Sequence, residues 1–198
     1  MRNSIRQYGV AIRAMLVLTV VLGIGYTAII TGIGQLVAPA QANGSMIEVD
    51  GEVVGSAILG QSFTDADGNA LPEWFQSRPS AAGDGYDGGA SSGSNYGPEN
   101  EDLISAIEAR QAAIAELDGV AIEDIPADAV TASASGLDPH ISPEYALLQV
   151  ARVADARGLP EQDVRALVES MIQVRDLGYL GEPTVNVLQL NIALAKLG

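Results

Sequence analysis

The sequence has no cysteine, and only one lysine and one histidine among its 198 residues. Without cysteine, the chain can form neither a disulfide nor a thiolate nucleophile. Because its one lysine is Lys196, it also lacks the phosphate-binding loop G-x-x-x-x-G-K-[ST]. His140 is the only imidazole available to a metal site or an acid–base centre. We therefore expect no catalytic site, no metal site and no cofactor bound by the chain's own motifs.

Acidic residues are missing from the first 47 positions, and basic residues are scarce after them. Arg2, Arg6 and Arg13 carry the N-terminal charge, and 25 Asp and Glu residues begin at Glu48. The chain after Arg13 holds seven basic residues, which gives this part a formal charge of −18. That sign argues against binding nucleic acid or anionic lipid, since both bind through positive charge. We expect a solvated acidic surface, with concentration of cations near a pore as the alternative.

An apolar run extends from Ala14 to Ala38, and no charged residue lies between Arg13 and Glu48. About 20 apolar residues in a helix are enough to cross the hydrocarbon core of a bilayer. A helix also satisfies its own backbone hydrogen bonds, which hydrocarbon requires. The pattern predicts four regions: a cytoplasmic N-terminus at 1–12, a transmembrane helix at 13–36, a spacer at 37–45 and an extracytoplasmic domain at 46–198.

The arginines that precede this helix set its predicted orientation. They favour a cytoplasmic N-terminus, so the C-terminal domain is expected outside the cell membrane. A cleaved signal peptide is the alternative, because Ala38-Pro39-Ala40-Gln41-Ala42 ends in an Ala-x-Ala pattern. The apolar run is longer than the core of a typical signal peptide, which favours an uncleaved anchor. Both interpretations export the C-terminal domain.

Small side chains recur every four residues in the predicted membrane helix, at Thr19, Gly23, Thr27 and Thr31. Residues at this spacing share one helix face, where small side chains allow a second helix to approach closely. Threonine hydroxyls can also hydrogen-bond across such a contact. The alternative is that these residues face lipid. We favour a stripe that contacts a partner helix, in another membrane protein or in a second copy.

The C-terminal domain is predicted to be α+β, with a small sheet and about four helices. Asp50-Gly51 between two apolar segments indicates a hairpin, with strands at 46–49 and 52–59. A further strand is expected at 184–187, and a short strand or extended segment near Val130. Apolar spacing predicts helices at 101–117, 143–157, 160–174 and 187–197. Asn100 and Ser142 are the expected N-caps, and Gly119 suits a C-terminal end. Asn186 and Asn191, polar residues within an apolar run, are expected to hydrogen-bond to backbone.

The segment from Trp74 to Pro98 is the most distinctive in the chain. It begins Trp74-Phe75-Gln76-Ser77-Arg78-Pro79-Ser80-Ala81 and continues into a stretch rich in glycine and serine. Composition alone is typical of a flexible linker, but interleaved tyrosines, Asp and Asn favour a loop with specific contacts. The candidate partner-contact residues in this loop are Phe75, Arg78, Ser80, Asp87, Asn95 and Tyr96.

Three other motifs resemble functional sites but are incomplete. Gly89-Ala90-Ser91-Ser92-Gly93 matches G-x-S-x-G, yet no strand precedes it and His140 would have to be its base. Asp65-Ala66-Asp67-Gly68-Asn69 lacks the glycine and glutamate positions of a calcium loop, so we interpret it as a polar turn. Asp138 and His140 are too few for a metal site and are expected to secure the start of the next helix.

Short motifs follow one another in order along nearly the whole chain: Thr31-Gly32-Ile33-Gly34-Gln35, Gly60-Gln61-Ser62-Phe63, Phe75-Gln76-Ser77-Arg78-Pro79-Ser80-Ala81, Ser92-Gly93-Ser94-Asn95-Tyr96-Gly97-Pro98, Val130-Thr131-Ala132-Ser133-Ala134-Ser135-Gly136-Leu137-Asp138-Pro139-His140-Ile141-Ser142-Pro143, Gln149-Val150-Ala151-Arg152-Val153-Ala154 and Val185-Asn186-Val187-Leu188-Gln189-Leu190-Asn191. In this set and order, the sequence resembles the C subunit of the Kdp-type potassium-transporting ATPase. One departure is Thr27, where the family often has proline after the tyrosine.

The resemblance implies a non-catalytic subunit of a bacterial complex for high-affinity potassium uptake. The implied partners are a channel-like potassium-translocating subunit and a P-type ATPase subunit that forms an aspartyl phosphate. ATP and potassium would be handled by the complex. The resemblance also implies a role in assembly and as a catalytic chaperone that raises the ATP affinity of the ATPase subunit. Since phosphate-binding motifs are lacking, we expect that effect to pass through the membrane helices as a coupling free energy.

The residues alone leave a second function open. A membrane-anchored extracytoplasmic binding or adaptor module acting without partners would have the same anchor, charge and fold class. An anchored hydrolase is the third possibility, and it would require Ser91 for activity.

Overall fold

The computed structural model describes residues 2–197, and the side chains from Ile5 onward. The chain divides near residue 46 into two compact units, which are described separately. The first is helical, and the second combines helices with short strands.

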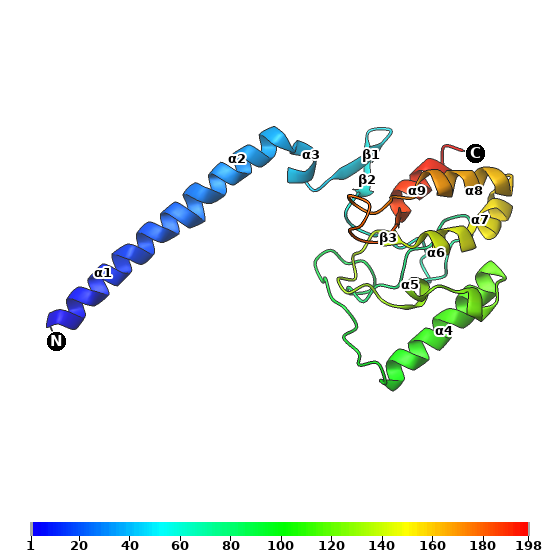
Figure 1. The fold of residues 1–198 in the computed structure, drawn as a ribbon, viewed down its shortest axis with the longest axis horizontal. Coiled ribbons are helices and arrows are strands. Elements are labelled where there is room, and N and C mark those ends of the chain that lie inside the picture. Colours follow the sequence, from blue (N-terminus) through cyan, green and yellow to red (C-terminus); the bar gives the residue numbers. More distant parts are fainter. Residues whose placement is uncertain (1, 198) are drawn as a thin grey trace. The chain divides into compact units, whose positions relative to one another are not determined.

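The N-terminal unit is one long helix with a change of helical type at its centre (Figure 1). It consists of α1 (Arg2–Leu18), the π-helix η1 (Thr19–Tyr26) and α2 (Thr27–Val37). Within it, Ile5–Val37 is long and apolar enough to cross a membrane, with a mean hydropathy of 2.2 over its most apolar 18 residues. None of that window is buried against the rest of the protein. The predicted apolar helix is present, and it begins well before residue 13.

The helix ends at Ala38, whose backbone angles (φ −142°, ψ 62°) leave the helical region. Pro39 then starts the one-turn helix α3 (Pro39–Ala42). The side-chain amides of Gln35 and Asn43 exchange two hydrogen bonds, of 3.2 and 3.0 Å, and so join α2 to the residues after α3. The stretch predicted as a spacer therefore contains a defined turn.

The second unit has the predicted α+β class, but it contains two separate two-stranded sheets in place of one. The first is the hairpin of β1 (Met46–Val49) and β2 (Glu52–Ser56), at the predicted position. The second pairs β3 (His140–Ile141) with β4 (Val185–Asn186) in antiparallel register, His140 opposite Asn186. The helical segments are α4 (Glu101–Asp118), η2 (Ile122–Asp124), α5 (Ala127–Val130), α6 (Pro143–Leu148), α7 (Val150–Arg157), α8 (Glu161–Ser170) and α9 (Val187–Leu194).

The core of this unit lies among α6 to α9 and the small sheet of β3 and β4 (Figure 1). Its fully buried side chains include Val150 and Val153 of α7, Val164 and Val168 of α8, and Leu190 of α9. Helix α4 contributes Ile114, which is its one buried residue. Burial of such side chains contributes roughly 1.5–3 kcal/mol each relative to exposure. Phe75, from the irregular loop, completes the core.

Helix ends agree with the caps predicted from the sequence. The Asn100 side chain accepts hydrogen bonds from the amides of Asp102 and Leu103, and Gly119 ends α4 in the left-handed region at φ 67°. The Ser142 side chain accepts from the amide of Tyr145 at the start of α6. These residues satisfy backbone groups that a helix end leaves unpaired.

The helix predicted at 143–157 is interrupted at Gln149. The side-chain amide of Gln149 donates to the Tyr145 carbonyl at 3.4 Å. In a continuous α-helix, the backbone N–H of Gln149 would donate to that carbonyl. The backbone N–H instead bonds to Leu147, so the chain forms α6 and α7. Gln149 itself keeps right-handed helical angles (φ −78°, ψ −10°), so the interruption is confined to this residue.

No strand forms at Val130 itself, because residues 127–130 make the one-turn helix α5. Extended backbone begins at the next residue, Thr131 (φ −102°, ψ 132°), so the predicted extended segment lies just after the helix. Two interactions hold the turn: Thr131 Oγ1 donates to the Ala127 carbonyl at 2.7 Å, and Arg110 donates to the Val130 carbonyl at 2.8 Å. Other boundaries move inward. β2 ends at Ser56, α8 at Ser170 and α9 at Leu194.

Candidate functional site

The loop of residues 74–98 begins with a buried anchor. Phe75 has no exposed surface, and its backbone is held by the side chain of Asn191 in α9. The Phe75 N–H donates to Asn191 Oδ1 at 3.0 Å, and Asn191 Nδ2 donates to the Phe75 carbonyl at 3.0 Å. The amide side chain thus satisfies both backbone groups, as a neighbouring strand would. This confirms the expectation that Asn191 bonds to backbone.

The next residue of the loop is held in the same way by Gln149. The Gln76 N–H donates to Gln149 Oε1 at 2.6 Å, and Gln149 Nε2 donates to the Gln76 carbonyl at 3.2 Å. Gln149 is itself fully buried. The backbone of Phe75 is thus held by Asn191 of α9, and that of Gln76 by Gln149, between α6 and α7. Side chains here fix two successive loop residues as a neighbouring strand would.

Arg152 of α7 joins this loop to α4. Its guanidinium donates to the carbonyls of Pro72 and Trp74, to Gln149 Oε1, and to Asp118 Oδ1 at 2.7 Å. The Arg152 and Asp118 side chains are only 6% and 1% exposed. Burial raises the pKa of Asp118 above its ordinary value, and the charge of Arg152 opposes that rise only in part. Removing one partner of such a buried ion pair strongly lowers the free energy of unfolding, because the other charge is left buried without compensation.

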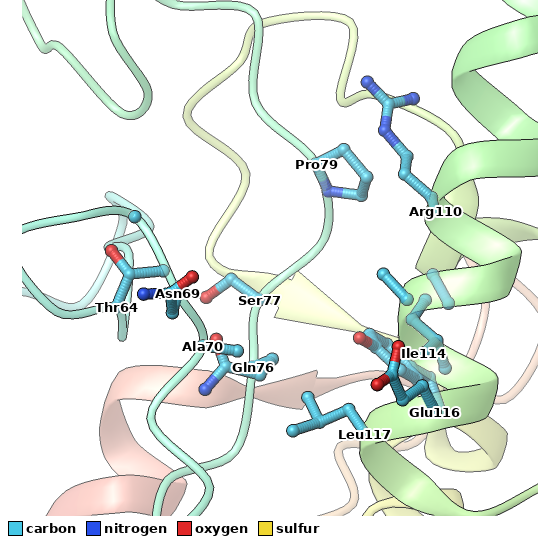
Figure 2. A pocket seen from close by; sticks show the side chains of 14 residues that line it. Thr64, Asn69, Ala70, Gln76, Ser77, Pro79, Arg110, Ile114, Glu116 and Leu117 are labelled. Carbon is cyan, nitrogen blue, oxygen red and sulfur yellow. The ribbon is translucent and has the colours of Figure 1, made fainter.

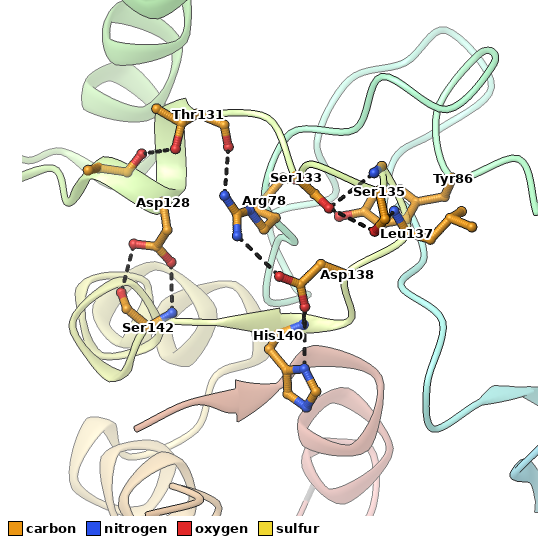
Figure 3. A network of polar contacts seen from close by, with 12 residues as sticks. Arg78, Tyr86, Asp128, Thr131, Ser133, Ser135, Leu137, Asp138, His140 and Ser142 are labelled. Carbon is orange, nitrogen blue, oxygen red and sulfur yellow. Dashed lines mark hydrogen bonds and ion pairs between the residues drawn. The ribbon is translucent and has the colours of Figure 1, made fainter. Parts of the chain in front are cut away.

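A second polar network holds the middle of the loop against residues 131–140 (Figure 3). Arg78 Nη1 lies 3.1 Å from Asp138 Oδ2, and Arg78 Nη2 donates to the Thr131 carbonyl at 3.3 Å. Asp138 Oδ1 accepts from the His140 N–H at 3.0 Å and lies 3.3 Å from His140 Nδ1. Burial alone would raise the pKa of Asp138, but these hydrogen bonds and Arg78 outweigh it and lower that pKa.

Ser80 and Tyr86 fold the loop back on itself. Ser80 Oγ donates to the Gly136 carbonyl at 2.6 Å and accepts from the Tyr86 N–H at 2.9 Å. The Tyr86 hydroxyl donates to the Arg78 carbonyl at 2.6 Å. Burial raises the pKa of Tyr86 to about 12, so its hydroxyl stays a donor at neutral pH.

The glycine- and serine-rich part of the loop also packs closely. Ser91 Oγ and the Ser92 N–H both donate to the Ser135 carbonyl, at 2.9 and 3.0 Å. A Cβ added to Gly93 would lie 2.8 Å from the Ala134 carbonyl oxygen. At Gly136, with φ +69°, it would lie 2.7 Å from the Cβ of Ala82. The prediction of a loop with specific contacts is therefore confirmed, and glycine is needed here for close approach.

The six candidate contact residues of the loop fall into two groups. Phe75 is buried, and Arg78 and Ser80 are occupied in the networks above. Asp87, Asn95 and Tyr96 lie at the surface, where Asp87 Oδ1 accepts from the Gly89 N–H. Contact with a partner stays a prediction for all six, and the surface positions of the second group suit it better.

A groove of about 810 Å³ lies between α4 and residues 64–79 (Figure 2). Ile114 and Leu117 form part of its apolar wall, and Arg110 and Glu116 stand on the same helix. Tyr145, only 3% exposed, also lines it, and burial raises the pKa of its hydroxyl.

The serine of the G-x-S-x-G match and the one histidine are not brought together in the structure. Ser91 donates to a backbone carbonyl, and none of its hydrogen bonds reaches His140, which is engaged with Asp138. Within residues 2–197 no group of three potential metal ligands comes together. Asp65 accepts from the amides of Asp67 and Asn69, which confirms a polar turn.

The small-residue stripe of the N-terminal helix crosses its change of helical type. Thr19 and Gly23 lie in η1, and Thr27 and Thr31 lie in α2. In an α-helix, residues four apart advance by about 40° beyond a full turn, so a long stripe drifts around the helix. A π-helix has more residues per turn, which counters this drift. Contact of the stripe with a partner helix stays a prediction.

Sequence reasoning missed Gln149, Arg152 and Arg157, which hold the start of the loop. The Arg157 guanidinium lies 4.2 Å from the Trp74 ring centroid and donates to the Glu73 carbonyl at 2.7 Å. One signal was present: Gln149 and Arg152 are polar residues three apart in an otherwise apolar helical pattern, and thus share its inner face.

Comparison with known proteins places this arrangement in a family. A family model described as "KdpC: K+-transporting ATPase, c chain" matches residues 8–196. The potassium-transporting ATPase KdpC subunit of Kineococcus radiotolerans is 54% identical over 192 residues, which cover 97% of this chain and 94% of that protein. The subunit of Caulobacter vibrioides is 55% identical over 186 residues (93% and 90%), and that of Mycobacterium tuberculosis is 49% identical over 193 residues (97% and 99%). The chain belongs to the KdpC family, the C chains of the K+-transporting ATPase.

Proposed function

We propose that this chain is a non-catalytic subunit of an ATP-driven complex for high-affinity potassium uptake. The observation that carries the proposal is the family match across residues 8–196, with relatives named as subunits of that ATPase. Its partners are a channel-like potassium-translocating subunit and a P-type ATPase subunit.

The proposed topology places the N-terminus in the cytoplasm and the second unit outside the cell membrane. Supporting it are the arginines before the apolar helix and the acidic residues that all follow it. The helix Ile5–Val37 anchors the chain to the membrane in which the complex works. The stripe of Thr19, Gly23, Thr27 and Thr31 is then the surface for a partner helix.

The second unit is proposed to dock over the potassium entrance of the channel-like subunit. Surface residues of the 74–98 loop, Asp87, Asn95 and Tyr96, would contribute to that contact. The chain is also proposed to support assembly and to raise the ATP affinity of the ATPase subunit. Lys196, the one lysine, stands alone, and no phosphate-binding motif accompanies it. The effect on ATP is therefore proposed to act through the membrane helices as a coupling free energy.

The test is extraction of the tagged full-length chain from potassium-starved cells with a mild detergent, followed by mass spectrometry. Stoichiometric recovery of a P-type ATPase and a polytopic channel-like subunit is expected. Recovery of this chain alone in several detergents would instead favour the solitary anchored module. ATPase activity measured against ATP concentration, with and without the chain, tests the effect on affinity. Tight nucleotide binding by the chain alone would contradict coupling through the membrane helices.

A further inference from the structure

Between α8 and β4 the chain forms a projecting hairpin, residues 173–184, which we call the finger. Gln173 and Thr184 close its base with two backbone hydrogen bonds, of 2.8 and 3.0 Å. Asp176 and Leu180 pair near its tip with two more, each of 2.9 Å. Residues 173–182 are all exposed, so the finger is a defined turn that packs little against its own unit.

The finger displays large apolar side chains to solvent. Val174 is 80% exposed, Leu177 81%, Tyr179 69% and Leu180 49%. The first three are the most exposed large apolar residues described in the second unit. Exposed apolar groups that gather on one projecting turn, not scattered singly, mark interaction surfaces. The core lies elsewhere, so these side chains contribute little to it.

The backbone at the tip costs further stability. Leu177 and Gly178 have φ of +53° and +81°, and the Tyr179 N–H bonds to the Asp176 carbonyl. These values are those of a type I′ turn, which favours Asn, Asp or Gly at both central positions. A leucine there is strained, and its side chain is directed into water. Backbone strain is concentrated at binding and switch regions of proteins, which makes this tip a candidate for a functional contact.

We infer that the finger is a docking peg, whose Leu177 and Tyr179 insert into an apolar pocket on another subunit of the transport complex. This inference rests on the proposed function, because the family is named as a subunit of a multi-chain ATPase. The pocket belongs to a different chain and lies on the side of the membrane that holds the second unit.

Two observations select a protein pocket over other occupants. The finger carries Arg175 paired with Glu182, together with Asp176, on a unit of strong negative charge, so an anionic lipid surface is disfavoured. Four side chains on one turn also cover far less than the roughly 1,200 Å² of a stable interface, so the finger alone would not hold two copies of this chain together. A small rigid apolar tip instead suits an anchor at the centre of a larger contact.

The first test removes the apolar tip while relieving its strain. Leu177→Asn with Tyr179→Ser is expected to fold as well as the natural full-length chain, because Asn tolerates a positive φ. Recovery of the ATPase and channel-like subunits in detergent should fall by roughly tenfold to thirtyfold, as for loss of an interface anchor. Ile122→Asn, at an exposed apolar residue on η2, is the matched control and should leave recovery unchanged.

The second test identifies the occupant directly. A photo-reactive amino acid replaces Leu177 in the full-length chain, and cells are irradiated before extraction. A covalent adduct with another subunit of the co-purified complex is expected. An adduct with a second copy, an adduct with lipid alone, or undiminished recovery of the double variant would each overturn the inference. Failure of the natural chain to recover any transport subunit would instead reject the proposed function.

Discussion

The 74–98 loop and the finger are both irregular, yet they use their side chains in opposite ways. In the loop, Phe75 is buried and Arg78 and Ser80 bond to residues of distant segments. In the finger, residues 173–182 are exposed and the main bonds join its own two arms. The loop therefore contributes to the stability of its unit, whereas the finger is free to serve a contact. The difference shows that irregular backbone can be either part of the core or a surface feature, depending on which distant residues its side chains meet.

The largest effect is expected from Asn191→Leu. This change keeps the branched shape and the number of heavy atoms but leaves the buried N–H and carbonyl of Phe75 without partners. The free energy of unfolding should therefore fall by about 3 kcal/mol. Urea unfolding of the full-length chain in detergent measures it, with fluorescence of Trp74 as the reporter beside the altered site. Asn95→Gly, at an exposed residue with φ +54°, is the control and should change little. Equal losses in both variants would show that Asn191 does not hold the loop.

Two glycines sharpen the comparison: Gly136, which packs against Ala82 of the loop, and Gly178 in the finger. Gly136→Ala places a Cβ 2.7 Å from Ala82 at a positive φ, and should lower the free energy of unfolding by about 2–3 kcal/mol. Gly178→Ala in the finger also has a positive φ but meets nothing within 4 Å, so only backbone strain of about 1 kcal/mol is expected. The same urea measurement checks both. A larger loss at Gly178 would contradict the packing described for the loop.

Acid should weaken the loop through Asp138. Its folded-state pKa is lowered, so its contribution is complete above the unfolded value near 3.9 and is lost as pH falls through the folded pKa. Because its side chain is 34% exposed, that contribution is about 1 kcal/mol or less. Asp138→Asn should remove this contribution at neutral pH, so the free energy of unfolding should fall less steeply as the pH is lowered. The pKa of Asp118 is raised, so its contribution to the free energy of unfolding changes with pH in the opposite direction. That contribution is the same in the natural chain and in Asp138→Asn, so it cancels when the two free energies are subtracted.

Urea unfolding at a series of pH values gives this comparison. Asp84→Asn, at an exposed residue of the same loop, serves as the control for loss of one charge. A variant at Asp138 with the same acid dependence as the natural chain would contradict the assignment.

The smallest effect is expected from Arg175→Ala in the finger. Arg175 pairs with Glu182, but their side chains are 43% and 75% exposed, so water and salt screen the attraction. The free energy of unfolding should change by less than about 0.5 kcal/mol. A loss comparable to that of Gly136→Ala would mean that the finger, too, is part of the stable core.

Much of the fold could be predicted because local signals decided it. The hairpin at Asp50-Gly51 and the caps Asn100 and Ser142 depend on neighbouring residues, and all three are observed. The bond between Gln149 and the Gln76 backbone could not be predicted, because the two residues are 73 apart in sequence. Phe75 was a candidate for a surface contact, but its side chain is buried in the core, and its backbone is held by Asn191, which is 116 residues distant. Periodicity and composition carry no information about such pairings.

The reciprocal amide bonds between Asn191 and Phe75 also have a consequence for biosynthesis. A chain still emerging from the ribosome cannot fix the backbone of Phe75 until residue 191 has been made. Contacts of such long sequence separation require closing a large segment of chain before they contribute. The start of the loop therefore acquires its shape only after synthesis has passed residue 191. A product terminated before that residue would carry the N-terminal apolar helix without the folded loop, and a probe of loop structure would distinguish it from a longer product.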